Sequence, residues 1–463
     1  MVTLNALALS AVLLIFFWFL GSALLALLHT QRDLVRNFLI APAAGVLTSL
    51  YCTYVLSRLG LPVRSFAVPL AAVLFLAALT ILAWRRPLFP ARQVAPFIIV
   101  AFVALIATGW PLLTNGFAWL AKANPDFTLY VLDAHRLADQ GFLDSPVPST
   151  WTAQTDWPSL LVVFPALGQR TGTDLLLAWV VSVTGRNGLE IYMPVMVALQ
   201  VILVAAASAL ISTPYRLARL LAGTLMSVAA MMTLGLALQL IAQVLGLIAT
   251  VLACVLCLSP FYRLGRSLFL RFVVLASVVM AAYVLIYPEM LPIFALSFLV
   301  YHLGNPRDLR RFGLKELAGI LAIAALSAVL IAPDAIGSLL FLFHQFGAAV
   351  TRMRYPEIFP YFLIPSGVSA LWGLTPYVPH ETTLLAIAVV IGGALTVFTA
   401  ISAVWLLFRG EAMAAVLIVM IGLMLFLFLN GSAFGVFKLA MYMQPFMLTC
   451  FVLAVCRLTR IAR

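Results

Sequence analysis

The chain has 463 residues, a mean hydropathy of +1.14 and only 9% charged residues, while hydrophobic residues make up 65% of it. Because a soluble domain is only about half apolar, this composition excludes an ordinary soluble protein and predicts a polytopic membrane protein. The formal net charge of +12 is explained by positively charged membrane loops, and no nucleic-acid-binding motif occurs, so we expect no nucleic-acid partner.

Apolar runs of roughly 17 to 25 residues, each long enough to cross about 30 Å of hydrocarbon as a helix, predict about 13 transmembrane helices. Their centres lie near residues 16, 47, 75, 104, 201, 227, 249, 279, 296, 324, 395, 421 and 447. The runs do not alternate with a period of two, which excludes membrane-spanning strands. We therefore expect an all-α polytopic membrane protein with one transmembrane domain over residues 1–463. Its first helix lacks the basic start and cleavage site of a secretion signal.

The distribution of arginine and lysine predicts the orientation, because basic residues prefer cytoplasmic loops. If the C-terminal RLTRIAR is cytoplasmic, its side of the membrane holds 18 of the 27 Lys and Arg residues and 4 of the 15 Asp and Glu residues. We therefore expect a cytoplasmic C-terminus in a bacterial inner membrane. The five cysteines all fall in apolar runs, and we interpret them as small core residues.

Two connections are much longer than the others, residues 115–188 and 333–382, and both fall on the side opposite the arginine-rich loops. Long connections in compact proteins are usually functional or disordered, and these two are too apolar and aromatic to be disordered. In the first, the apolar segment 159–183 is interrupted by GQRTGTD. Since neither half can span the bilayer, we expect two amphipathic juxtamembrane helices lying along the membrane surface.

The stretch NPDFTLYVLDAHRLADQG (124–141) opens the first long loop and predicts a helix, because it starts with an N-cap residue and a proline at the first helical position. At 100° per residue, Asp126, Tyr130 and Asp133 share one face. Asp126 either only complements the helix dipole or takes part in chemistry. A carboxylate that accepts a proton opposite cations that hold an anionic leaving group is a group-transfer arrangement.

A multi-spanning protein with this pattern at the start of its first large external loop resembles the GT-C family of membrane glycosyltransferases. The family includes protein O-mannosyltransferases and the lipid A aminoarabinose transferase. The positions that carry the likeness are Pro125, Asp126, Tyr130, Ala134, Leu137, Ala138 and Gly141. The chain departs from many members in having four predicted helices before this loop and a single acid where they show two adjacent acids.

The resemblance implies an inverting transfer of a sugar from a polyprenyl-phosphate donor, in which the loop acid deprotonates or orients the acceptor hydroxyl. Asp126 occupies that position, and by its spacing Asp133 supplies a second carboxylate. In this family, basic or imidazole side chains of a later external loop hold the donor phosphate, and Arg352, Arg354 and His380 are in reach by topology. Lipid headgroups are the alternative partners of the two arginines. We assign no metal site, although a divalent metal stays an open alternative.

Three further residues are candidates for orienting the substrates. Tyr130 lies beside Asp126 on the predicted helix face. Glu289, in the YPE tripeptide of an external hairpin, either orients donor or acceptor or reaches water from a proline-broken helix end. Glu381 either fixes the tautomer of His380 or belongs to an exposed helix start.

The function expected from the sequence is a glycosyltransferase whose active site faces the periplasm and whose acceptor is a glycan, a lipid or a protein. A lipid-linked donor needs no nucleotide-binding fold, and no GxGxxG or P-loop occurs in a strand-to-helix setting. The alternatives are a transporter or flippase of lipid-linked sugars, or a polymerase or ligase of lipid-linked glycans.

Overall fold

The computed structural model describes residues 2–28, 33–87, 89–121, 125–140, 142, 170–212, 215–258, 266–305, 313–350, 365–374 and 383–459. These ranges are helical with short connections and contain no strand. The first half comprises α1 (Val2–Leu27), α2 (Leu34–Arg58), α3 (Val63–Arg85), α4 (Ala91–Asn115), η1 (Gly116–Ala118), α5 (Pro125–Asp139), α7 (Gly172–Thr184), α8 (Gly188–Ser208), α9 (Arg216–Ser227) and α10 (Ala230–Ala237). The second half comprises α11 (Ile241–Cys257), α12 (Arg266–Ile286), η4 (Pro288–Met290), α13 (Leu291–Gly304), α15 (Leu314–Leu330), α16 (Ala332–Val350), α17 (Ser366–Leu371), α18 (Thr383–Leu407), α19 (Ala412–Leu429) and α20 (Ala433–Thr459).

Nine helices in the described ranges are long and apolar enough to cross a membrane, or up to eleven if two bent pairs are each one span. The bent pairs are α9 with α10, at 41°, and α15 with α16, at 105°. Helix α11 has only 17 residues, roughly 25 Å at 1.5 Å per residue. The polytopic α-helical fold is therefore confirmed and the count of 13 is not. Every predicted centre nevertheless lies in a helix.

Helices α1 and α2 cross in close contact because each has a glycine at the crossing. A Cβ atom on Gly21 would lie 1.7 Å from the carbonyl oxygen of Ala41, and one on Gly45 would lie 1.9 Å from the carbonyl oxygen of Phe17. Small residues at such crossings let two backbones approach, which is how helices gain contact where lipid provides no hydrophobic drive.

The first long loop contributes α5 and α7, which pack on each other. Helix α7 begins within the predicted polar break, but Gly172 to Val181 are all buried. It therefore lies inside the protein and differs from the amphipathic surface helix that the sequence predicts. On α5, His135 accepts a hydrogen bond from the Gly188 backbone N–H at 3.0 Å, which joins α5 to the start of α8.

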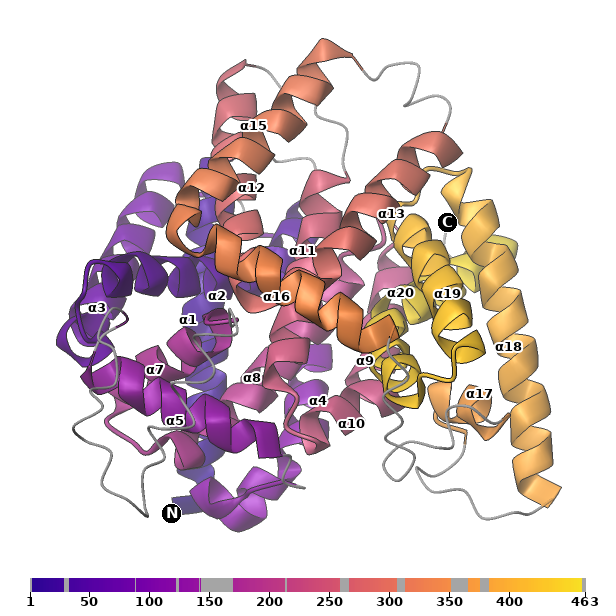
Figure 1. Cartoon of the computed structure of the whole chain (residues 1–463), viewed down its shortest axis with the longest axis horizontal. Coiled ribbons are helices and arrows are strands. Elements are labelled where there is room, and N and C mark those ends of the chain that lie inside the picture. The colour runs from indigo at the N-terminus through magenta and orange to yellow at the C-terminus, as the bar shows by residue number, and fades with distance from the viewer. Residues whose placement is uncertain are drawn as a thin grey trace.

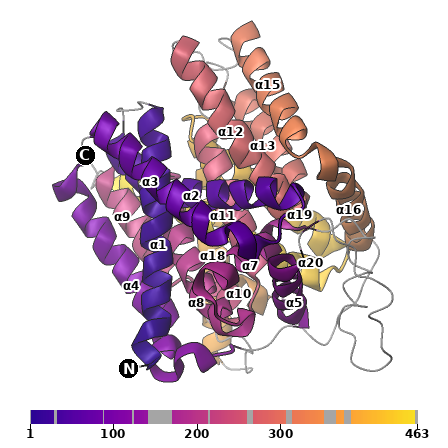
Figure 2. The same cartoon turned by 90° about the vertical axis from the view of Figure 1, so that its left-hand side faces the viewer.

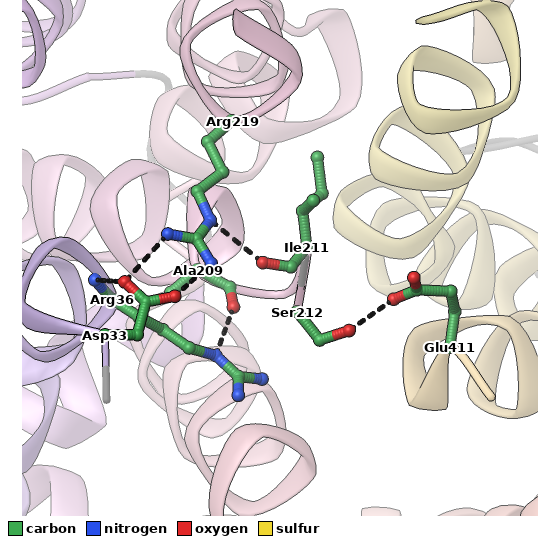
Figure 3. A network of polar contacts seen from close by, with 7 residues as sticks. All are labelled: Asp33, Arg36, Ala209, Ile211, Ser212, Arg219 and Glu411. Atoms are coloured by element: carbon green, nitrogen blue, oxygen red, sulfur yellow. Dashed lines mark hydrogen bonds and ion pairs between the residues drawn. The ribbon is translucent and has the colours of Figure 1, made fainter. Parts of the chain in front are cut away.

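A polar network joins four chain segments at one end of the bundle (Figure 3). Asp33 accepts hydrogen bonds from both terminal nitrogens of the buried Arg219, whose Nε donates to the Ile211 carbonyl at 2.9 Å. On the other side of the α8–α9 connection, Ser212 donates to Glu411 at 2.7 Å, and Glu411 also pairs with Arg457. All of these residues belong to the side that the sequence assigns to the arginine-rich loops.

The ion pairs of the described ranges each join residues assigned to the same side of the membrane. Asp33 with Arg219 and Glu411 with Arg457 lie on the arginine-rich side. The pairs on the other side are Arg58 with Asp334, Arg64 with Asp139, Arg136 with Asp133, Arg170 with Glu289, and Arg186 with Glu190. The sorting of loops to two opposite ends therefore agrees with the contacts.

Helix α16, in the second long loop, runs obliquely across the front of the bundle in Figure 1, on the side where α5 also lies. The perpendicular view in Figure 2 places both helices on the side away from α4. Helix α16 contacts η4 and α12. The two long loops thus contribute helices to the same face of the molecule.

Candidate functional site

The candidate site is built around Arg170, which directly precedes α7. Its Nη1 donates to Glu289 Oε1 at 3.0 Å, and its Nη2 donates to Tyr130 Oη at 3.5 Å. The side chains of Arg170 and Glu289 are only 16% and 17% exposed. One guanidinium thus joins α5, α7 and η4 in a largely buried position, where an ion pair is far less screened than at the surface.

Aromatic rings enclose this guanidinium. Its Cζ lies 4.8 Å from the ring centroid of Tyr287 and 5.3 Å from that of Phe341 on α16, both within the range of cation–π attraction. Tyr442 of α20 donates a hydrogen bond to the Tyr287 hydroxyl. The arginine is therefore held both by the ion pair of its charge and by the rings that contact its guanidinium.

The turn between α12 and α13 positions Tyr287 and Glu289. Pro288 is the first residue of η4, where its missing N–H costs nothing, and the following Glu289 points to Arg170. Gly246 of α11 makes room for the turn, because a Cβ there would lie 2.6 Å from the Cβ of Tyr287. Glu289 Oε2 is buried and has no hydrogen-bond partner in the described part of the chain.

Lys438 and Asp126 complete the charged groups of the site. Lys438 lies on α20 one helical turn before Tyr442, and it interacts electrostatically with Arg170, Glu289 and Asp126. Asp126 lies in the first turn of α5 and is exposed. Two cations and two carboxylates therefore gather here, so the cluster is close to neutral when all four are ionised.

Tyr130 keeps its proton at neutral pH. Burial raises the pKa of Tyr130 to about 12; the charge of Arg170 opposes this shift, and those of Asp174, Asp126 and Glu289 add to it. Because its oxygen accepts from Arg170, its own O–H proton is left to donate to an oxygen of a bound molecule.

Asp133 belongs to a second polar group between α5 and α7. It pairs with Arg136 at 3.2 Å and hydrogen-bonds to Asp174 of α7. Burial raises the pKa of both carboxyl groups, and the charge of Asp133 raises the pKa of Asp174 further. Because Asp133 is held by Arg136 beside the buried Asp174, it is engaged within the protein rather than open to a substrate.

The structure brings three of the predicted residues, Asp126, Tyr130 and Glu289, into one cluster. The expected phosphate ligands Arg352, Arg354 and His380, with Glu381, lie outside the described residues. Sequence reasoning missed Arg170 as a site residue, although the break GQRTGTD in an apolar segment was a signal for it.

The chemistry that this arrangement can perform follows from its charges. The described ranges contain no group of three His, Cys, Asp or Glu residues that could hold a metal ion. An exposed carboxylate can accept a proton, while a guanidinium and an ammonium can hold an anion.

Comparison with known proteins assigns the chain to no family: no family model matches it, and no curated protein matches its sequence.

Proposed function

We propose that the chain is a GT-C type membrane glycosyltransferase. It transfers a sugar from a polyprenyl-phosphate donor, with inversion, to a hydroxyl of a glycan, lipid or protein at the periplasmic face of a bacterial inner membrane. The observation that carries the proposal is the cluster in which the exposed Asp126 lies within electrostatic range of Tyr130, Arg170, Glu289 and Lys438.

The reaction assigns one role to each group. Asp126 takes the proton of the acceptor hydroxyl, whose oxygen attacks the anomeric carbon while the bond from that carbon to the phosphate oxygen breaks. Polyprenyl phosphate leaves with one more negative charge than the donor phosphate carried. Once Asp126 is protonated, the cations of the cluster outnumber its carboxylates, so Arg170 and Lys438 stabilise that charge as it develops.

Tyr130 and Glu289 orient the substrates in this scheme. Tyr130 donates a hydrogen bond to a phosphate or sugar oxygen. Glu289 fixes the guanidinium of Arg170 and offers its Oε2, which has no partner among the described residues, to a sugar hydroxyl. Arg352, Arg354 and His380, with Glu381, are further donor-phosphate contacts in the proposal, contributed by the second long loop.

The experiment is a turnover assay in lipid nanodiscs with polyprenyl-phosphate sugars labelled in the sugar. It compares the wild-type protein with Asp126→Asn and with Asp139→Asn. Asp139 lies on the same helix, is exposed and pairs only with the exposed Arg64 among the described residues, so it is a matched control. Loss of a general base typically costs about 100-fold or more in rate.

We expect released polyprenyl phosphate from wild type and Asp139→Asn and at least about 100-fold less from Asp126→Asn. Equal turnover by wild type and Asp126→Asn would exclude Asp126 as the base. Movement of the lipid across the bilayer without its cleavage would instead identify a transporter or flippase. Transfer of a preassembled glycan from the lipid would identify a ligase or polymerase.

A further inference from the structure

Two adjoining cavities lie among α1 to α4, at the end of the bundle that carries the network of Figure 3. The first cavity, about 300 Å³, lies between α1, α2 and the end of α3. The second cavity, about 250 Å³, lies between α1, α2, α4 and α8. Trp18, Phe38 and Phe89 line both, so the two cavities meet at these rings.

Two arginines give the first cavity a positive charge. Arg85 and Arg86 line it, no acidic residue does, and neither arginine forms an ion pair within the described ranges. The Nε of Arg85 is buried and donates to no described acceptor, although its guanidinium lies 4.0 Å over the ring of Trp84. A buried N–H without an acceptor is costly, so an oxygen of a bound anion would satisfy a group that no described residue satisfies.

The backbone at Arg86 supports the same reading. Arg86 directly follows α3 as its C-cap residue and has a φ of 43°, a left-handed conformation that favours glycine at helix ends. An arginine that stands where glycine would be less strained points to a use for its side chain at this cavity.

The second cavity suits a hydrocarbon chain. Its walls are apolar except for the indole nitrogen of Trp18 and the hydroxyl of Ser208, which already donates to the Val204 carbonyl at 2.9 Å. Trp18, Phe38 and Phe89 contact one another with ring centroids 5.3 to 6.1 Å apart and line both the charged and the apolar cavity. A charged cavity that adjoins an apolar cavity matches the headgroup and the hydrocarbon chain of one amphiphile.

We infer that the two cavities bind an anionic phospholipid of the bilayer. Its phosphate lies on Arg85 and Arg86, and one acyl chain passes the three rings into the second cavity. Basic pockets between transmembrane helices bind acidic headgroups in this way. The site is formed by other helix ends than those around Arg170, and it does not depend on the proposed glycosyl transfer.

The test is native mass spectrometry of the full-length protein, stripped of lipid and titrated with phosphatidylglycerol or phosphatidylcholine of the same acyl chains. The double variant Arg85→Gln/Arg86→Gln removes the headgroup site. Arg92→Gln is its control, because Arg92 is an exposed arginine near the same turn that lines neither cavity. Ala101→Phe fills the second cavity and leaves both arginines unchanged.

We expect wild type and Arg92→Gln to bind one phosphatidylglycerol about tenfold or more tightly than phosphatidylcholine. The double variant should lose this preference. Ala101→Phe should weaken the binding of phosphatidylglycerol by about tenfold, whereas a phosphatidylglycerol with short acyl chains should bind Ala101→Phe and wild type equally well. An equal loss in Arg92→Gln would overturn the inference, since it would indicate general surface charge. Preferential retention of polyprenyl phosphate over phosphatidylglycerol would overturn it as well.

Discussion

Arg170 contacts four residues from three other parts of the chain: Tyr130 on α5, Tyr287 and Glu289 around η4, and Phe341 on α16. Such a residue determines the geometry of the site as well as its charge. A planar fork can donate to two partners and stack on rings at once, whereas a lysine ammonium offers only a point charge.

Arg170→Lys should therefore keep the charge but lose the geometry. We expect the affinity for a polyprenyl-phosphate sugar to fall by about tenfold or more, in line with a lost charge-assisted hydrogen bond. Donor affinity can be measured by titration in nanodiscs. Arg186→Lys, in an exposed pair with Glu190, is the control that should bind as wild type does. Unchanged affinity in Arg170→Lys would remove Arg170 from the donor site.

The Asp133–Asp174 pair makes stability depend on pH. Because the pKa of Asp174 is raised in the folded protein by burial and by Asp133, its folding contribution is fully present below the usual carboxyl pKa of about 4 and is lost as pH rises through the raised value. Asp174→Asn, which mimics the protonated acid, should remove this loss.

The measurement for this pair is the thermal unfolding midpoint of wild type and Asp174→Asn between about pH 4 and 8. The midpoint of the variant should rise relative to wild type as pH increases. Asp139→Asn, at an exposed position, should show no such trend. A variant that is less stable by the same amount at every pH would show that the pair carries no shifted proton.

The sequence could predict those site residues whose signals are local. Asp126 and Tyr130 follow from a helix start and a 3.6-residue period, and Glu289 from a carboxylate in an apolar hairpin. Arg170 meets Glu289 across 119 positions of the chain, and nothing local to either residue specifies that contact. The pairing of Asp133 with Asp174 likewise depends on how α5 packs on α7.

At the scale of elements, the crossing of α1 and α2 depends on Gly21 and Gly45. A Cβ on Gly45 would lie 1.9 Å from a backbone oxygen of α1, which cannot move without shifting the helix. Gly45→Ala should therefore destabilise the protein by about 1–3 kcal/mol, a typical cost of overpacking.

The loss can be measured as a lower unfolding midpoint in detergent. Gly422→Ala, in α19, is the matched control, because a Cβ there would have no atom of the described residues within 4 Å. Alanine also favours a helix over glycine by up to about 1 kcal/mol, so the control should be neutral or more stable. Equal midpoints for wild type and Gly45→Ala would mean that the two helices separate easily.

Hydropathy located the helices well and their breaks poorly. It counts apolar residues and carries no information on direction, so the 105° turn between α15 and α16 is invisible to it. The same limit explains α7. The segment is apolar, but its short length correctly excluded it as a membrane span. Only tertiary packing decides that Gly172 to Val181 are buried rather than lying on the membrane surface.

At the scale of the whole molecule, charge sorts the chain to two ends. The buried Arg219 lies with Asp33 at one end, and Arg170 lies with Glu289 at the other. Contacts alone fix which loops share an end and leave the absolute orientation to the distribution of basic residues. Since basic residues favour the cytoplasm, we propose that the end with Arg219 is cytoplasmic and that the Arg170 site faces the periplasm.

Cysteine labelling in intact cells tests this orientation. Arg409→Cys and Thr114→Cys place exposed thiols at opposite ends, while four of the five native cysteines are buried. A maleimide that does not cross membranes should label Thr114→Cys in intact cells and Arg409→Cys only after the inner membrane is permeabilised, against the unsubstituted chain as background. The reverse pattern would place the Arg170 site in the cytoplasm. A periplasmic acceptor would then be out of reach of the site. The proposed reaction therefore requires that the Arg170 site face the periplasm.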